Sequence, residues 1–565
     1  MLRRTFKRAA YASGLAPLIS SARFAGRLLI NPHFRRLQQM TWAEYLRWRR
    51  YAPVLRPSLL PAGARPRRAL IVTKGTVLGA EIELGLIKAL ELAGFTSVVL
   101  TDSALEKFYR LAGVSEFVRW ESLTEPAPIG AARALVAGAT RVEDLLGVEH
   151  AGARVGKFAA STTFRWLKVG RLDFSDPKVT GTLAEHLADG MARASAAWTI
   201  LERVKPDLAL FMGNRYTGQG ELMDVCLTAG IDVLTWFDAH RSRSLMLKRY
   251  RLDNRDRHHG SIADETWEQL RAMPWGHEHD AALRREIDDA YASGDWYSRG
   301  GTQVNKSIVS ADALRAQLGL DPAKKTAVIF PHIVWDATLF WGADLFANYE
   351  DWLVATVRAA AENPRVNWII KIHPAHVAKS AMERYDGAPA ELTAIRERVG
   401  ALPPHVVVVP PDTNINTFAL FPVMDYCVTV RGTIGIEAAN AGACVLTAGS
   451  GRYDRRGFTT DSDTQEQYLH RLATIETLPA PTQAQVDLAR RFAYGTFVVR
   501  PWRVTALSID HGRDIEATTS VSLNVSSSDA LHRSPDLVAF AEWAADGRQE
   551  DFVSTGLLPA LSRSA

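Results

Sequence analysis

Cysteine and long apolar runs are both scarce in this chain. Its 565 residues include three cysteines, Cys226, Cys427 and Cys444, which are widely spaced and form no CxxC pair. That spacing argues against a disulfide scaffold and predicts buried free thiols in a reducing compartment. No apolar run approaches the roughly 18 residues that a membrane-spanning helix needs, so we expect no integral membrane protein. A hydrophobic content of 47% with 23% charged residues is typical of a soluble globular protein.

Acidic residues are almost absent from the first 68 positions. Fifteen Lys or Arg residues occur there against one acid, Glu44, whereas the rest of the chain is net acidic. Apolar residues recur at helical spacing among these charges, and aromatic residues are interleaved with them: Leu15, Leu18, Ile19 and Ala22, with Phe6, Phe24, Trp42, Tyr45 and Trp48. This basic helical arm suits an anionic membrane surface; the alternative is a helix packed on the protein's own domain with solvated arginines. Nucleic acid is not an expected partner, because the body is acidic and carries no reader motif.

The segment 425–460 carries the clearest functional signal. An apolar strand at 426–430 breaks at Arg431, Gly432 and Thr433 into a helical segment ending at Gly442, and a second strand follows at 443–447. The first turn of such a βαβ unit lies at the carboxyl edge of a parallel sheet, where ligands bind. Bare N–H groups at a helix start attract phosphate, and glycine lets it approach the backbone. The segment therefore predicts an anion site.

Two side chains extend this predicted anion site. Thr433 can offer its hydroxyl to the same phosphate, and Glu437, one helical turn further on, can accept the hydroxyls of a ribose. The structural alternative is that Thr433 is an N-cap and Glu437 an acid favoured by the helix dipole.

A second motif, KIHP at 371–374, directly follows an apolar strand at 366–370. Pro374 ends the strand at the sheet edge, which leaves Lys371 and His373 at a carboxyl end of the same predicted sheet. A lone histidine before proline is more often a turn residue. The two motifs together, about sixty residues apart, favour a shared ligand crevice.

These motifs, followed by GRYDRRGFTTDSDTQEQYL, resemble the capsule polysaccharide biosynthesis proteins, which include bacterial Kdo transferases, within the wider GT-B group. The resemblance covers roughly residues 326–475. It implies that His373, Gly432 and Thr433 face the phosphates of a nucleotide sugar, that Glu437 faces its ribose, and that Tyr453 lies in the loop behind the phosphates. Arg431 departs from the pattern, since many relatives carry a small hydroxyl residue there. We count it, with Lys371 and Tyr453, among the donor-binding residues.

The resemblance also implies the fold: an α/β, GT-B-like protein with two Rossmann-like, doubly wound domains facing a central cleft. We divide the chain into a basic arm (1–68), an acceptor domain (69–310), a donor domain (311–480), and a return helix with a peripheral tail (481–565). A strand at 69–73, a glycine turn and a helix at about 80–93 open the first domain as another βαβ unit.

The acceptor side is predicted from turns after two strands of the first domain. The strand 208–212 ends in a turn carrying Asn214 and Arg215, which can bind oxygens of an acceptor. The strand 231–236 is followed by Asp238 and His240, which can assist proton transfer. The adjacent pair His258-His259 lacks a third ligand at suitable spacing and predicts a solvated loop, not a metal site.

The function these features favour is a glycosyltransferase. It would move a sugar, Kdo or a related acidic sugar, from a nucleotide-activated, CMP-linked donor to a capsule or surface-polysaccharide acceptor that is free or lipid-linked. Cations at the cleft would neutralise the leaving phosphate, so neither a metal nor another cofactor is expected. The predicted location is cytoplasmic, at the inner face of the cytoplasmic membrane. Three alternatives stay open: a teichoic-acid-type polyol-phosphate transferase, a nucleotide-sugar epimerase, and a non-catalytic scaffold of an export complex.

Overall fold

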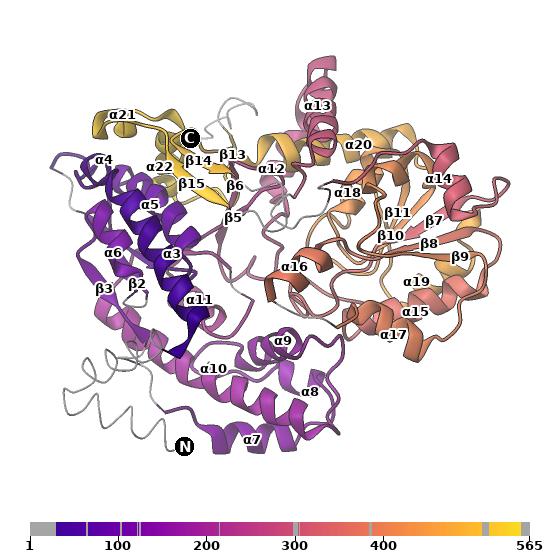
Figure 1. Ribbon diagram of the computed structural model, residues 1–565, viewed down its shortest axis with the longest axis horizontal. Coiled ribbons are helices and arrows are strands. Elements are labelled where there is room, and N and C mark those ends of the chain that lie inside the picture. Colours follow the sequence, from indigo (N-terminus) through magenta and orange to yellow (C-terminus); the bar gives the residue numbers. More distant parts are fainter. Residues whose placement is uncertain are drawn as a thin grey trace.

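The computed structural model describes residues 30–63, 66–101, 104–120, 123, 126–213, 215–297, 303, 305–383, 387–510 and 519–554. Two β-sheets, each covered by helices on both faces, form two halves that lie side by side (Figure 1). The first half holds the indigo and purple elements, and the second holds the orange ones. Both sheets are largely parallel, so the α/β, Rossmann-like fold expected from the sequence is confirmed.

The first sheet has seven strands in the order β13-β6-β5-β4-β1-β2-β3. Five are parallel, and β6 and β13 add an antiparallel edge. Their bounds are β1 Arg67–Val72, β2 Phe95–Leu100, β3 Glu116–Val118, β4 Leu208–Phe211, β5 Asp232–Asp238, β6 Ser244–Tyr250 and β13 Pro501–Arg503.

The second sheet has six parallel strands in the order β12-β11-β10-β7-β8-β9. They are β7 Thr326–Ile329, β8 Asn367–Lys371, β9 Val406–Val409, β10 Tyr426–Thr429, β11 Cys444–Thr447 and β12 Thr460–Asp461. Because β8 and β10 flank β7, the two motifs predicted to share a crevice end at the same edge of this sheet.

Helices cover both faces of the first sheet. One face packs mainly against α4 Ala52–Leu55, α5 Val77–Leu92, α6 Glu106–Tyr109 and α22 Pro535–Asp546. The opposite face packs against α7 Ile129–Ala137, α8 Glu143–Leu146, α9 Val155–Leu167, α10 Pro177–Val204 and α11 Gln219–Thr228. The apolar core on this second face continues into the second half, so one hydrophobic cluster joins the two sheets.

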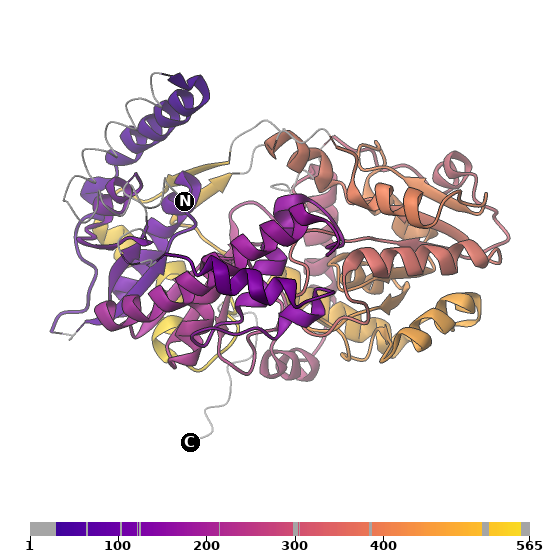
Figure 2. The ribbon, with the colours of Figure 1, turned by 90° about the horizontal axis from the view of Figure 1, so that it is seen from below.

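The second sheet is covered in the same way. The shared core lies under α15 Tyr349–Glu362, α17 Ala390–Arg398 and α19 Gln465–Ala473. The other face packs against α12 Asp264–Ala272, α13 His277–Ser293, α14 Ala311–Leu318, α18 Ile434–Asn440 and α20 Gln483–Tyr494. The short α16 (Ala375–Glu383) directly follows the KIHP motif. Figure 2 shows the two halves end to end, with the first-half helices reaching toward the second.

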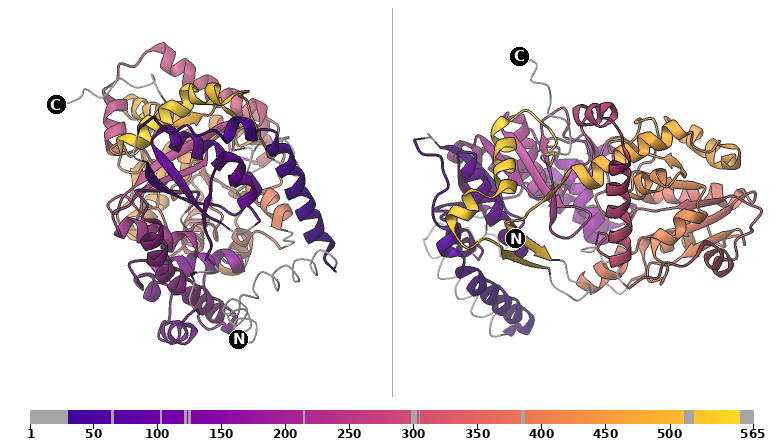
Figure 3. Two further views of the ribbon diagram at one scale, coloured as in Figure 1. Left: turned by 90° about the vertical axis from the view of Figure 1, so that its left-hand side faces the viewer. Right: turned by 90° about the horizontal axis from the view of Figure 1, so that it is seen from above.

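The chain returns to the first half after α20, as the sequence predicted. Trp502 of β13 pairs with Leu245 of β6, which places a late segment at the edge of the first sheet. The tail beyond it was expected to be peripheral, and that expectation is wrong. Phe540 and Trp543 of α22 are buried, and Phe540 stacks on Trp502 with ring centroids 5.2 Å apart. Figure 3 shows the yellow C-terminal elements, α21 (Ser528–His532), α22 and the β14–β15 hairpin (Leu507–Asp510, Ser520–Leu523), lying against the indigo helices.

The basic arm is described from residue 30 onward, so the apolar residues predicted from Phe6 to Phe24 lie outside the described residues. Its described part forms α3 (Pro32–Arg49). Trp48 of this helix is fully buried against the first half. Within the described ranges, no helix has the length and apolar character required to cross a membrane.

Candidate functional site

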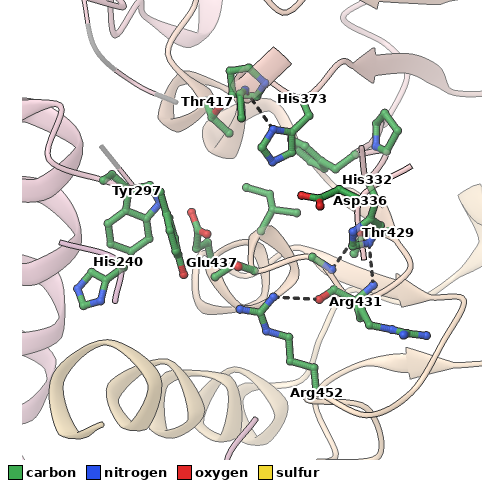
Figure 4. Close-up of a pocket in the computed structure, with 18 of the residues that line it drawn as sticks. His240, Tyr297, His332, Asp336, His373, Thr417, Thr429, Arg431, Glu437 and Arg452 are labelled. Atoms are coloured by element: carbon green, nitrogen blue, oxygen red, sulfur yellow. Dashed lines mark hydrogen bonds between the residues drawn. The ribbon is translucent and has the colours of Figure 1, made fainter. Parts of the chain in front are cut away.

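A cavity of about 410 Å³ lies between the two halves of the molecule (Figure 4). Nine residues predicted from the sequence line it: Arg215, Asp238, His240, Lys371, His373, Arg431, Gly432, Thr433 and Glu437. Asn214, the remaining predicted acceptor residue, lies outside the described residues. The cavity therefore brings together side chains from both sheets, and the turns after β5, β8 and β10 supply most of the predicted ones.

The turn between β10 and α18 forms the floor of the cavity on the side of the second sheet. The Gly432 amide donates to Oγ1 of Thr429 at 3.3 Å, which ties the turn to the end of the strand. Thr433 is the residue before the helix, but its side chain makes no capping hydrogen bond. The N-cap alternative for Thr433 therefore fails, and its hydroxyl lies at the cavity wall.

Tyr453 does not line the cavity, contrary to its predicted contact with the donor. Its side chain is buried beneath the turn, where its hydroxyl donates to the Gly432 carbonyl at 2.8 Å. A Cβ at Gly435 would lie 2.1 Å from this hydroxyl oxygen, so the tyrosine fits because residue 435 is glycine. Tyr453 thus supports the turn from below.

The guanidinium of Arg431 also points away from the predicted phosphate position. It pairs with Asp344 and donates to the carbonyl oxygens of Phe340 at 2.5 Å and Ala343 at 3.3 Å. Its charge is therefore neutralised while it holds the 340–344 segment. What faces the cavity wall is its backbone, whose N–H donates to Nε2 of His332 at 3.3 Å.

His373 is held as a neutral hydrogen-bond donor. Its Nδ1 accepts the Ala375 amide at 3.1 Å, so the ring proton is on Nε2 (Figure 4). Burial, with a further contribution from Lys379, lowers the pKa of His373 to about 3. An Nε2–H group at this position can donate to a phosphate oxygen without itself titrating near neutral pH.

Lys371, two residues earlier, is almost fully buried at the end of β8. Its Nζ donates to the Ile372 carbonyl at 3.1 Å. Burial, together with the nearby cation Lys306, lowers the pKa of Lys371 to about 7. This amine is poised to become fully charged when an anion enters the cavity, because an opposite charge favours its protonated form.

Glu437 is buried at the far side of the same turn and accepts a hydrogen bond from the Tyr291 hydroxyl. Burial raises the pKa of Glu437 to about 7, although Tyr291 and Arg452 oppose the shift. The carboxyl group is thus a hydrogen-bonded lining residue, and a dipole contact alone does not account for its surroundings.

Two arginines from opposite halves are the strongest electrostatic feature of the cavity. The Arg215 guanidinium lies between the rings of Phe237 and Trp341, at 5.5 and 5.1 Å from their centroids. Arg452 donates to the Arg431 carbonyl at 3.3 Å. Neither arginine forms an ion pair with a carboxylate in the part of the chain that the structure describes. Their charges are therefore available to an anionic ligand.

Sequence analysis missed Arg452 although the GRYDRRG motif contains it. The motif directed attention to its tyrosine, the next residue. His332 was also missed; its ring stacks on Tyr349 with centroids 4.6 Å apart, and burial lowers its pKa to about 3. A histidine after a strand and a proline was the available signal, at the end of β7.

His240 lines the cavity but is committed to another partner. Its Nε2 lies 2.8 Å from the Glu286 carboxylate, and the ring packs against Trp296 and Phe497. Burial lowers the pKa of His240 despite this carboxylate. Asp238, at the end of β5, is the other predicted proton-transfer residue and also lines the cavity.

The prediction of a solvated loop at His258-His259 is wrong for His258. This residue is buried in the cavity wall, its Nδ1 accepts the Gly260 amide at 2.9 Å, and its ring stacks on His259 with centroids 4.1 Å apart. Burial and the neighbouring arginines 215 and 452 hold the pKa of both histidines well below the ordinary value. Among the described residues, no group of three or more His, Cys, Asp or Glu side chains is placed to hold a metal ion.

Asp336 joins the two halves at one end of the cavity. Its carboxylate accepts from Arg165 and from the Tyr216 hydroxyl, both at 2.6 Å, and pairs with Lys379. Burial raises the pKa of Asp336, but Lys379 and Arg165 outweigh it and hold the pKa well below its ordinary value. Sequence analysis noted the Trp-Asp pair at a strand exit but could not supply its partners.

Comparison with known proteins bears on the fold alone. No protein-family model and no curated protein matches the chain by sequence. The KpsC β-Kdo 2,4 transferase of Thermosulfurimonas dismutans is similar at 14% identity, over 53% of this chain and 82% of that chain, with a TM-score of 0.32. UDP-GlcNAc 2-epimerase from Neisseria meningitidis is 12% identical over 76% and 96%, with a TM-score of 0.26. The rhamnosyltransferase SpnG is 14% identical over 76% and 95%, with a TM-score of 0.25. At such TM-scores these likenesses carry no argument about function, which must come from the cavity.

Proposed function

We propose that the protein is a glycosyltransferase that binds a nucleotide-activated sugar in the cavity between its halves. The observation that carries the proposal is the pair Arg215 and Arg452. They come from opposite halves, line one cavity, and have no carboxylate partner among the described residues. Unpaired guanidinium groups in a partly enclosed cavity favour a ligand with phosphate charge.

The remaining lining residues fit the parts of a nucleotide sugar. Nε2–H of His373, the amine of Lys371 and the turn at Gly432 and Thr433 would stabilise the leaving phosphate. Glu437 would accept the hydroxyls of the ribose. Asp238, at the acceptor side, would take the proton of the attacking hydroxyl.

In this proposal the cations of the cavity neutralise the leaving group, and no metal is needed. The donor is a CMP-linked acidic sugar of the Kdo class, and the acceptor is a capsule or surface polysaccharide, free or lipid-linked. The three cysteines are buried free thiols, which supports the predicted reducing, cytoplasmic compartment.

Ligand-induced thermal stabilisation tests the binding step. CMP, UDP and GDP are compared, because a ligand that binds only the folded state raises the melting temperature. Arg215→Gln and Arg452→Gln should each weaken binding about tenfold, the usual loss for a charge-assisted hydrogen bond. Arg141→Gln, whose side chain is 73% exposed, is the control and should bind as the wild type does. Equal stabilisation of all four proteins would contradict the proposal.

Product analysis tests the transfer step. With a CMP-linked sugar and a capsule fragment, the expected product is an elongated saccharide, and His373→Ala should slow its formation about a hundredfold. An altered nucleotide sugar formed without acceptor would indicate an epimerase instead. Transfer from a CDP-polyol would indicate the teichoic-acid-type reaction. Capsule production that is unchanged by His373→Ala would indicate a scaffold.

A further inference from the structure

Helix α3 stands out from the first half of the molecule, at the upper left of Figure 2. One face of it is fixed to the domain. Trp48 is fully buried, Arg47 pairs with Glu81 at 2.9 Å, and Tyr45 meets the edge of Phe108 with ring centroids 5.7 Å apart. These contacts determine which residues the helix turns outward.

The outward face of α3 combines arginines with large apolar side chains. Successive helical residues are rotated by about 100°, so positions three and four apart share a face. The outward face consists of Arg35, Arg36, Gln39, Trp42, Ala43, Leu46, Arg49 and Arg50, all exposed. Trp42 and Leu46 are 53% and 46% exposed, and Met40 beside them is 48% exposed.

This face carries no acid. Glu44, the one carboxylate between residues 30 and 50, is half-buried and pairs with Arg47. The Trp42 ring is held in place by Lys107 and Tyr45, at 4.9 and 5.3 Å from its centroid. The face therefore presents an ordered aromatic ring and an aliphatic side chain, flanked by four arginines.

We propose that the outward face of α3 docks on an anionic lipid surface. At such a surface arginines meet the headgroups while tryptophan and leucine enter the boundary with the acyl chains, so both kinds of side chain gain. The face thereby assigns the membrane contact to particular residues of the basic arm. The inference concerns a different part of the molecule from the cavity and does not rest on the proposed transferase function.

Other occupants fit this face less well. In a symmetric contact with a second copy, the arginines of both copies would approach each other, and the face offers no acids to pair them. Nucleic acid would satisfy the arginines but would leave the leucine and methionine without an apolar environment. A lipid surface is the occupant that accommodates charge and apolar area together.

Vesicle co-sedimentation of the full chain tests the inference. The probes are vesicles of phosphatidylcholine alone and of phosphatidylcholine mixed with phosphatidylglycerol in equal parts. The wild type should bind the anionic vesicles and not the neutral ones, and added salt should weaken the binding. Arg35→Gln with Arg36→Gln should reduce the partition coefficient roughly fivefold for each arginine. Trp42→Ala with Leu46→Ala should reduce it about tenfold.

Matched controls come from exposed residues outside the arm. Arg284→Gln with Arg285→Gln removes an adjacent exposed pair from α13, and Trp166→Ala removes a tryptophan that is 72% exposed. Both controls should bind vesicles as the wild type does. Thermal melting of every variant confirms that it is folded.

Three outcomes would overturn the inference. The first is equal binding to neutral and anionic vesicles, or to neither. The second is α3 variants that bind like the wild type, which would place any lipid contact elsewhere. The third is a dimer in light scattering that Trp42→Ala with Leu46→Ala dissociates, which would make the face an interface between copies.

Discussion

The guanidinium of Arg165 in α9 and the carboxylate of Asp336 after β7 form a 2.6 Å ion pair that connects the two halves of the molecule. Both side chains are about one-third exposed, so the pair is solvated and its energy is modest. Its position matters more than its strength, because it closes one end of the cavity.

The first prediction concerns this ion pair. Arg165→Gln should lower the free energy of unfolding by roughly 1 kcal/mol or less and should widen the separation of the halves. Urea denaturation and the radius of gyration from small-angle X-ray scattering measure these two effects. The control is Arg68→Gln, which breaks a 2.7 Å pair with Glu116 within the first half. If both variants change the radius of gyration equally, the Arg165 pair has no special role in closure.

The second prediction concerns the support of the turn. Gly435→Ala should cost about 1–3 kcal/mol in the free energy of unfolding, because the added methyl group would overlap the Tyr453 hydroxyl. In a Tyr453→Phe background the cost should be smaller. Gly181→Ala in α10 is the control, since a methyl group added there would have no other atom within 4 Å; it should be neutral or stabilise by about 0.5–1 kcal/mol. A neutral Gly435→Ala variant would disprove the tight packing.

The third prediction concerns the ionisation of Glu437. The pKa of this group in the folded protein is about 7, above its ordinary value of 4.5. Its neutral form favours folding, so its contribution to stability is present in acid and is lost as the pH rises through about 7. Glu437→Gln should therefore reduce the loss of melting temperature between about pH 6 and pH 8. An unchanged pH dependence would show that Glu437 is not the titrating group.

The fourth prediction concerns the buried histidines. The pKa values of His332 and His373 are lowered from 6.5 to about 3. Their contribution to stability is therefore present above 6.5 and is lost as the pH falls from there toward about 3, because the unfolded chain takes up protons first. His332→Gln with His373→Gln should flatten the stability profile below about pH 6.5. Exposed His277, replaced by Gln, is the control and should leave the profile unchanged. A double variant with the wild-type slope would refute the assignment.

Much of the fold could be predicted because each parallel strand is a short apolar run ended by glycine or proline. The runs at 426–430 and 443–447 became β10 and β11, and the run at 366–370 became β8. β6 could not be found in this way. Its Lys248 and Arg249 are fully buried, and their charges are paired with Asp551 and Asp232, which are distant in the sequence. Buried pairs between distant residues leave no periodic signal.

The candidate site shows the same division. The sequence located the turns that reach the cavity, because these follow from the ends of strands. It did not show where each side chain points. Arg431 turns toward Asp344, and Tyr453 lies under Gly432, because their partners come from elsewhere in the chain. Arg452, adjacent to Tyr453 in sequence, is the side chain that reaches the cavity.

The return of the chain to β13 has a mechanical consequence. The backbone passes from the first sheet to the second after β6 and passes back before β13, so two covalent connections join the halves. A single tether would permit tumbling in any direction, whereas two tethers leave one easy bending axis that runs through both. Opening of the molecule should therefore follow a single angular coordinate, like the covers of a book about its spine, and a protease cut in either tether should leave the halves attached but free to twist.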